Sequence, residues 1–186
     1  MKIIISGLTA SGKSTLAKGL SSALGMEYFS GSTKLREFMP PKEFEYWESQ
    51  KGLDAIKFRL KHPKYDRLLD NFILKYVKTH DNIVLDSWVA SWKVKDRDAI
   101  KIYLKVGLET RARRVSERDS IDYDSALRFM KEKDKLSSKI YFNLYKIKIG
   151  GEDLMPFDLV VNSSDFSIEE LRDLCLGYID KRKRAI

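Results

Sequence analysis

Residues 7–14 read Gly-Leu-Thr-Ala-Ser-Gly-Lys-Ser, and this run constrains the fold of the chain more than any other. A β-branched run at 2–6 precedes it, as expected of a buried parallel strand. Apolar residues at helical spacing follow from Ser14 to Leu24, and Gly25 then stops the pattern. A strand, a glycine-rich turn that carries a lysine and a hydroxyl, and a helix together make a phosphate-binding loop. The segment therefore predicts a nucleotide-binding α/β domain.

Each residue type in this loop meets a requirement of holding a triphosphate. Gly7 and Gly12 let the backbone turn tightly around anionic oxygens, and the following helix adds the positive end of its dipole. Lys13 is expected to reach the β- and γ-phosphates, and the Ser14 hydroxyl to bind Mg²⁺. We expect ATP to be held by the loop and the start of the helix, namely Gly7, Leu8, Thr9, Ala10, Ser11, Gly12, Lys13, Ser14 and Thr15.

The composition fits one α/β domain of 186 residues with anionic ligands, since the net charge is +8. The basic residues are spread along the chain, so nucleic acid is the less favoured partner, and the cluster at 181–184 is interpreted as a solvated helix end. No run approaches the ~20 apolar residues that span a bilayer, and a strand that begins at residue 2 leaves no room for a signal peptide. Cys175 is the sole cysteine and is expected to be a buried thiol. We therefore expect a cytoplasmic protein without a membrane partner.

Strand-like runs alternate with helical patterns along the whole chain. This alternation predicts a parallel sheet with helices on both faces. Two helical stretches stand out as insertions, 40–80, which Pro40-Pro41 and His62-Pro63 divide, and 123–145, for which Asp122 is a plausible N-cap. Such insertions would cover a rigid loop and keep water from a phosphoryl transfer. The candidate strands are 2–6, 27–29, 82–86, 99–104 and 157–162.

Asp86 ends the apolar run Ile83-Val84-Leu85, at the strand end where ligands bind in open α/β sheets. It could hold Mg²⁺ through water, orient the acceptor, or simply cap the next turn. We favour a functional role, because the phosphate-binding loop is expected on a neighbouring strand.

Ser30-Gly31-Ser32-Thr33 follows the second strand and precedes Arg36. Ser32 or Thr33 could be a helix N-cap. The same geometry would turn Arg36 toward a phosphate, where a bidentate guanidinium contact is strong. Both interpretations stay open.

Basic residues also mark the helices after the fourth strand. Arg111, Arg114 and Arg118 share one helix face, where they could contact the nucleotide, whereas Arg113 is interpreted as solvated. Lysines of the second insertion, Lys133 among them, could match developing phosphoryl charge, although lysines are common on exposed helices.

The chain resembles the P-loop nucleoside monophosphate kinases over nearly its whole length, and specifically the short archaeal cytidylate kinases. Besides the loop, the resemblance is carried by residues 30–36, 66–70, 84–92, 111–118, 145–147 and 157–162. It implies a three-layer P-loop NTPase fold with a five-stranded parallel sheet and two helical insertions. The whole chain would be one domain, with a core (1–39, 81–119, 150–186), an acceptor-binding subdomain (40–80) and a lid (120–149).

The resemblance also implies a function and a set of site residues. The reaction would be transfer of the ATP γ-phosphoryl group to CMP or dCMP with Mg²⁺, by a monomer or weak dimer. The implied roles are catalytic for Lys13, Arg36, Asp86 and Lys133, nucleotide-binding for Arg114 and Arg118, acceptor-binding for Ser30, Ser32, Arg36, Asp70 and Trp88, and metal-binding for Ser14 and Asp86.

The chain departs from the family pattern at the acceptor side. The family's acceptor-phosphate arginine falls on Trp88, and Lys133, Ser138 and Ile140 stand at lid positions that carry arginine in the family. Lysine does not reproduce a bidentate arginine, and the sequence leaves open whether another arginine, such as Arg59 or Arg97, replaces the missing one. The alternatives are therefore an adenylate kinase relative, or a diverged ATP-binding or ATP-hydrolysing protein with weak or no monophosphate kinase activity.

Overall fold

The structure, a computed structural model, describes residues 1–40, 52–150 and 153–184. Within these residues, five parallel strands form one sheet in the order β2-β3-β1-β4-β5. The strands are β1 (Lys2–Gly7), β2 (Glu27–Ser30), β3 (Ile83–Asp86), β4 (Ala99–Lys105) and β5 (Leu159–Asn162). This architecture confirms the predicted three-layer α/β fold.

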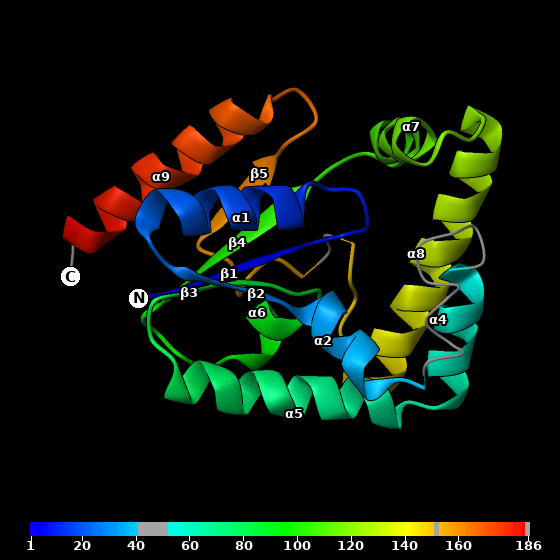
Figure 1. Cartoon of the computed structure of the whole chain (residues 1–186), viewed down its shortest axis with the longest axis horizontal. Helices are drawn as coiled ribbons and strands as arrows, with labels where there is room; N and C mark the ends of the chain where they lie inside the picture. The colour runs from blue at the N-terminus through cyan, green and yellow to red at the C-terminus, as the bar shows by residue number, and fades with distance from the viewer. Residues whose placement is uncertain (41–51, 151–152, 185–186) are drawn as a thin grey trace.

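Helices cover both faces of the sheet (Figure 1). Because successive strand side chains point to opposite faces, the isoleucines of β1 divide between two cores. Ile3 and Ile5 pack with α1 and α9, whereas Ile4 packs with α2, α5 and α6. The helices are α1 (Lys13–Leu24), α2 (Gly31–Phe38), α4 (Gly52–Lys61), α5 (Lys64–Thr79), α6 (Ala90–Lys93), α7 (Leu108–Asp119), α8 (Tyr123–Tyr145) and α9 (Ile168–Arg184).

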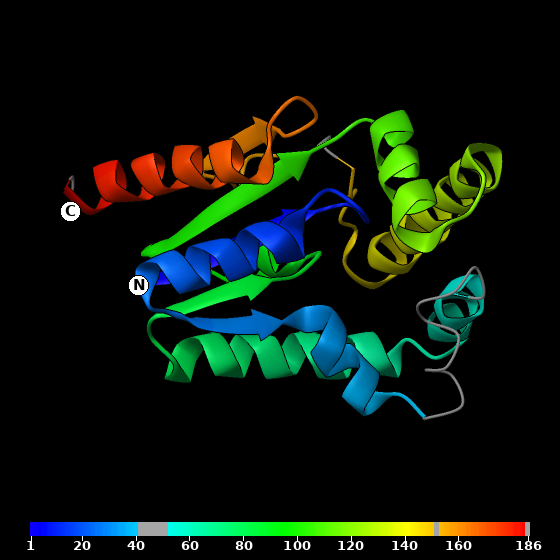
Figure 2. The same cartoon turned by 45° about the horizontal axis from the view of Figure 1, so that its top comes forward.

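The helices α4, α7 and α8 gather at one end of the molecule, beyond the strand ends that carry the phosphate-binding loop (Figures 1 and 2). There α8 packs against both α7 and α4, although α4 comes from the opposite part of the chain. Both termini lie at the other end. Of the two predicted insertions, α4 and α8 lie at this end, whereas α5 of the segment 40–80 packs on the sheet beside Ile4.

The predicted element bounds need few corrections. The last strand begins at Leu159 rather than at residue 157, because the Asp158 carboxylate, rather than a backbone carbonyl, accepts the Lys101 N–H at 2.8 Å. The break predicted at His62-Pro63 is confirmed, since α4 ends at Lys61 and α5 begins at Lys64. Pro41 and Trp47 lie outside the described residues.

Local end signals agree with the structure elsewhere. Asp122 is the N-cap of α8, and its Oδ1 accepts the Ser125 N–H at 2.8 Å, as predicted. Cys175 is fully buried, and burial raises the pKa of its thiol to about 11. In the part of the chain that the structure describes, no helix is both long and apolar enough to cross a membrane.

Candidate active site

The turn between β1 and α1 requires its glycines. Gly7 has φ +153°, and a Cβ there would lie 2.7 Å from the Leu104 carbonyl oxygen and 2.8 Å from the Ser11 Oγ. Gly12 has φ +92° and is the N-cap of α1, with no side-chain cap on the helix. Uncapped N–H groups at a helix start form an anion-binding site. The local geometry is therefore that of a phosphate-binding loop.

Lys13 folds back over this loop. Lys13 is 7% exposed, and its Nζ donates a hydrogen bond to the Leu8 carbonyl at 2.8 Å. Burial lowers the pKa of Lys13 to about 8, and the positive charge of Arg111 acts in the same direction, against Asp86 and Asp134. A bound phosphate would favour the charged form and raise this pKa again.

Asp86 lies beside the loop because β3 pairs with β1, with Asp86 in register with Ile5. It is 3% exposed and accepts a hydrogen bond from the Tyr28 hydroxyl at 2.9 Å. Burial and the nearby Asp86 charge raise the pKa of Tyr28 to about 12, so the phenol stays a donor. The expected neighbouring position of the two strands is confirmed, and the carboxylate contacts a tyrosine on the next strand rather than the backbone of a turn.

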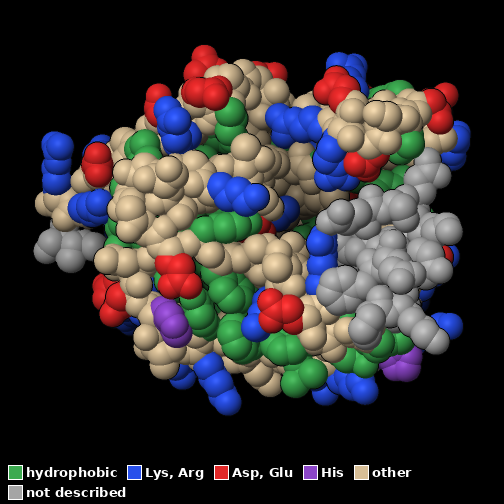
Figure 3. All heavy atoms as spheres, viewed as in Figure 1, with side chains coloured by type: hydrophobic (Ala, Val, Ile, Leu, Met, Phe, Trp, Pro, Cys, Tyr) green, Lys and Arg blue, Asp and Glu red, His purple; other side chains and the backbone are tan. Residues whose placement is uncertain are grey.

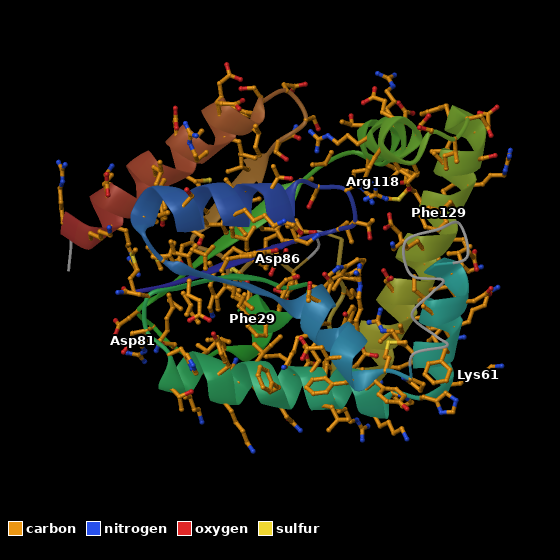
Figure 4. All side chains as sticks on the ribbon, in the orientation of Figure 1. Phe29, Lys61, Asp81, Asp86, Arg118 and Phe129 are labelled. Atoms are coloured by element: carbon orange, nitrogen blue, oxygen red, sulfur yellow. The ribbon has the colours of Figure 1, made fainter. Side chains whose placement is uncertain are left out.

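A cavity of about 550 Å³ opens in front of the loop. The labels of Figure 4 place Asp86 on its sheet side and Arg118 on its α7 side. Figure 3 shows Lys and Arg side chains bordering the hollow between the sheet and α7. Among the described residues, the lining is Thr9, Ala10, Lys13, Ser14, Ser32, Arg36, Gly52, Ile56, Arg59, Asp86, Trp88, Arg118, Asp119, Lys133 and Ser137.

An adjoining cavity of about 440 Å³ lies on the other side of the loop. It shares Ala10, Lys13, Ser14 and Arg118 with the first, so the two meet at the phosphate-binding loop. The sequence patterns did not predict its apolar wall, which Phe166, Ile168 and Leu171 form. The one available signal was Phe166, an aromatic residue soon after the last strand. The rest of its described lining is Ser11, Gly12, Thr15, Arg114 and Ser163.

The arginines of α7 divide into structural and cavity-lining residues. Arg111 is 3% exposed and binds the Thr9 carbonyl and the Asp134 carboxylate. Arg114 lines the second cavity and donates to the Ala10 and Ser163 carbonyls at 3.3 and 2.9 Å. Arg118 lines both cavities, and Arg113 is exposed, as expected.

The N-cap of α2 differs from both candidates of the sequence. Ser30, rather than Ser32 or Thr33, caps the helix, and its Oγ accepts the Thr33 N–H at 3.3 Å. The strand runs one residue further than predicted, so the cap falls on its last residue. Ser30 is absent from the lining of the first cavity. Ser32 and Arg36, which are one helical turn apart on α2, both line it.

One part of the lining of the first cavity brings together residues from distant parts of the chain. Trp88 is half-buried, and its ring centroid lies 5.9 Å from that of Tyr141 on α8. Arg59 of α4 lines the cavity, is 5% exposed, and pairs with the buried Asp66 of α5. Arg97 is exposed and lies outside the cavity lining. Of the two arginines suggested as replacements, Arg59 therefore lines the cavity and Arg97 does not.

The other residues expected at the lid and the acceptor site differ in whether they line the cavity. Lys133 lines the cavity, and burial together with the charges of Arg118 and Lys13 lowers its pKa to about 8. Asp70 is buried away from the cavity, and Ile140 packs in an apolar core. In place of Ser138, its neighbour Ser137 contributes to the lining.

Trp92, by contrast, is a core residue. Its ring packs edge-on against Phe157 at 4.7 Å between centroids, and its indole N–H donates to the Asp153 carbonyl at 3.0 Å. Trp88 precedes the turn into α6, lines the cavity and packs partly against the same apolar cluster as Trp92.

Comparison with known proteins identifies the family. A family model described as an AAA domain matches residues 3–136. The cytidylate kinase of Pyrobaculum islandicum is 35% identical over 95% of this chain and 91% of that protein. That of Sulfolobus acidocaldarius is 32% identical over 98% and 96% of the two chains. Shikimate kinase from Bacteroides thetaiotaomicron, 15% identical over 97% and 98%, shares the fold with a TM-score of 0.63. The chain thus belongs to the P-loop nucleoside monophosphate kinases, in the family of the cytidylate kinases.

Proposed function

We propose that the protein transfers the γ-phosphoryl group of ATP to a pyrimidine nucleoside monophosphate, CMP or dCMP. The observation that carries the proposal is the pair of cavities that meet at Lys13 and Ser14. A donor in the cavity beside Phe166 and an acceptor in the cavity beside Trp88 would place their phosphates on either side of the same lysine. The names of the cytidylate kinase relatives support the choice of base.

The donor half fits ATP and Mg²⁺ by its own chemistry. The Ser11 hydroxyl is buried in the loop, and none of the described residues hydrogen-bonds to it, so a phosphate oxygen would satisfy it. The exposed Ser14 hydroxyl and the Asp86 carboxylate line one cavity and offer the oxygen ligands that Mg²⁺ prefers. When bound, the ion would neutralise charge on the transferring phosphates.

The residues would act by positioning and charge rather than by covalent chemistry. An oxygen of the acceptor phosphate attacks the γ-phosphorus, the bond to the β–γ bridging oxygen breaks, and ADP leaves with that oxygen. Lys13, Lys133 and Arg118 would stabilise the transferring group, Arg36 would hold the acceptor phosphate, and Asp86 would orient the acceptor or a metal-bound water.

The chain regions would divide the work accordingly. Residues 40–80 would form the acceptor subdomain and 120–149 the lid, on a core of 1–39, 81–119 and 150–186. Support comes from α4 and α8, which contact each other and both contribute to the cavity lining outside the sheet. Asp70 would support the acceptor subdomain from within rather than touch substrate, since it is buried outside the cavity.

An assay of ADP release with ATP, Mg²⁺ and a panel of monophosphates tests the proposal. We expect release that depends on the acceptor and is fastest with CMP or dCMP. Lys13→Ala should abolish it, whereas Lys18→Ala, an exposed lysine of the same helix, should not. Release that no monophosphate stimulates would overturn the proposal in favour of an ATP-binding or ATP-hydrolysing protein.

A further inference from the structure

Arg59 is a buried guanidinium in the wall of the acceptor-side cavity. It comes from α4, is 5% exposed and lines the cavity with Ile56 and Gly52 of the same helix. The sequence offered Arg59 only as one of two possible replacements for a missing arginine, and the proposed reaction gives it no role yet.

Two neighbouring elements hold the Arg59 guanidinium in place. Nε and Nη2 donate to the two carboxylate oxygens of Asp66 at 3.2 and 2.5 Å, and Nη2 also donates to the Tyr141 hydroxyl at 3.1 Å. Asp66 belongs to α5 and is 1% exposed, whereas Tyr141 belongs to α8. A side chain fixed from two sides has little rotamer freedom to lose when a ligand binds.

This environment keeps Arg59 charged. Burial by itself lowers the pKa of the guanidinium, but the Asp66 charge and the hydrogen bonds outweigh it and raise the pKa above its ordinary value. The Asp66 contacts use Nε and Nη2 of a guanidinium group whose residue also lines the cavity. The arrangement suits an arginine that binds an oxyanion.

Trp88 lines the same cavity and, like Arg59, lies beside Tyr141. Its ring centroid lies 5.6 Å from the Lys13 ammonium. An indole offers one N–H donor and no charge, so it cannot replace a bidentate guanidinium. Arg118 belongs to the wall shared with the other cavity. Arg36 and Arg59, from α2 and α4, are the arginines that line only the acceptor-side cavity among the described residues.

We propose that Arg59 binds the phosphate of the acceptor nucleotide, while Asp66 and Tyr141 position its guanidinium. This inference rests on the proposed function and names the residue that recognises the acceptor phosphate. It predicts that Arg59 discriminates a nucleoside monophosphate from the corresponding nucleoside.

The test compares the affinities of CMP and cytidine by calorimetry in matched variants of the full chain. Arg59→Met combined with Asp66→Asn removes the guanidinium without leaving a buried carboxylate unpaired. CMP affinity should fall about 10- to 100-fold, the range for a lost charged hydrogen bond, while cytidine affinity stays unchanged. Arg67→Met, an exposed arginine of α5, is the control and should change neither.

A rescue separates phosphate recognition from a structural role. Adding Trp88→Arg to the double variant should restore part of the CMP affinity, which no structural role of Arg59 predicts. Arg59→Lys keeps the ion pair but loses the planar fork, and should weaken CMP several-fold and cytidine not at all. If the double variant does not fold, the Arg59→Lys variant alone tests whether Arg59 binds the phosphate.

The failure of this inference differs from the failure of the proposed function. If the wild-type protein phosphorylates CMP, and Arg59 variants that melt like wild type keep its CMP affinity and acceptor KM, the Arg59 assignment is wrong and the function stands. Equal losses of CMP and cytidine would also overturn the assignment. If the wild-type protein neither binds nor phosphorylates any monophosphate, both fall.

Discussion

Arg111 donates two hydrogen bonds to the Asp134 carboxylate, from Nη1 to Oδ1 at 3.1 Å and from Nη2 to Oδ2 at 2.6 Å. The same Nη1 donates to the Thr9 carbonyl at 3.3 Å. One buried guanidinium of α7 thus ties the phosphate-binding loop to α8. Because α8 also carries Lys133 and Ser137, this contact sets the position of the loop relative to that wall of the cavity.

Removal of the Asp134 carboxylate should leave the buried Arg111 charge without its ion-pair partner. We expect Asp134→Ala to lower the free energy of unfolding by about 3 kcal/mol, because Arg111 is 3% exposed and loses its ion-pair partner. Glu132→Ala, whose pairing with Lys135 at 3.9 Å is solvent-exposed, should cost less than about 0.5 kcal/mol. Urea denaturation measures both, and equal losses would contradict the structural role of the Arg111 contact.

Gly7 should tolerate no side chain. Gly7→Ala places a Cβ 2.7 Å from the Leu104 carbonyl oxygen at a φ that L-residues rarely adopt, and should cost about 2–5 kcal/mol. Gly177→Ala in α9 is the matched control, since its Cβ would meet nothing within 4 Å. It should stabilise by about 0.5–1 kcal/mol. Thermal melts decide the matter, and a Gly7→Ala protein as stable as wild type would refute the steric argument.

ATP binding should take up protons at alkaline pH. The pKa values of Lys13 and Lys133 are each about 8 in the free protein, so both lysines lose protons as the pH rises through that value. Bound phosphates would raise both pKa values, and binding at pH 9 should take up to about two protons, against almost none at pH 6.5.

Calorimetry in buffers of different ionisation enthalpy counts these protons. Lys133→Met should remove about one of them, whereas Lys131→Met, an exposed lysine of the same helix, should remove none. An uptake that is the same at pH 6.5 and pH 9 would show that the lysines do not titrate as the structure indicates.

Asp70 should make the protein less stable as the pH rises. Burial raises the pKa of its carboxyl from 3.8 to about 6, although the Tyr145 hydroxyl and Lys93 oppose the shift. Its Oδ2 is buried, without a hydrogen-bond donor among the described residues. Since the folded-state pKa is the higher one, stability is greatest below about pH 4 and is lost as the pH rises through 6.

The loss between pH 5 and pH 8 amounts to about 1.4 kcal/mol for this group. Asp70→Asn should therefore gain more stability over wild type at pH 8 than at pH 5, by about that amount. Urea denaturation at the two pH values measures it, with the exposed Asp124→Asn as the control for the loss of one charge. A gain of equal size at both pH values would contradict the buried, ionised carboxylate.

Local patterns account for what could be predicted. The glycine spacing of the loop, the β-branched runs and the Asp122 cap are each set by neighbours in sequence, and all appear in the structure at the expected places. Arg111 shows the limit of such patterns. Its place on the same helix face as Arg114 indicated a nucleotide contact, yet it binds Asp134 of α8 and the Thr9 carbonyl, which is 102 residues away.

The sequence by itself determined that a strand, a phosphate-binding loop and a helix open an α/β domain, since backbone sterics and side-chain periodicity act over a few residues. Only the tertiary structure decided which arginine stands at the acceptor side. Arg59, Asp66 and Tyr141 lie on three helices and meet because α4 packs between α5 and α8. Such a contact depends on how whole helices pack, and no short-range spacing encodes it.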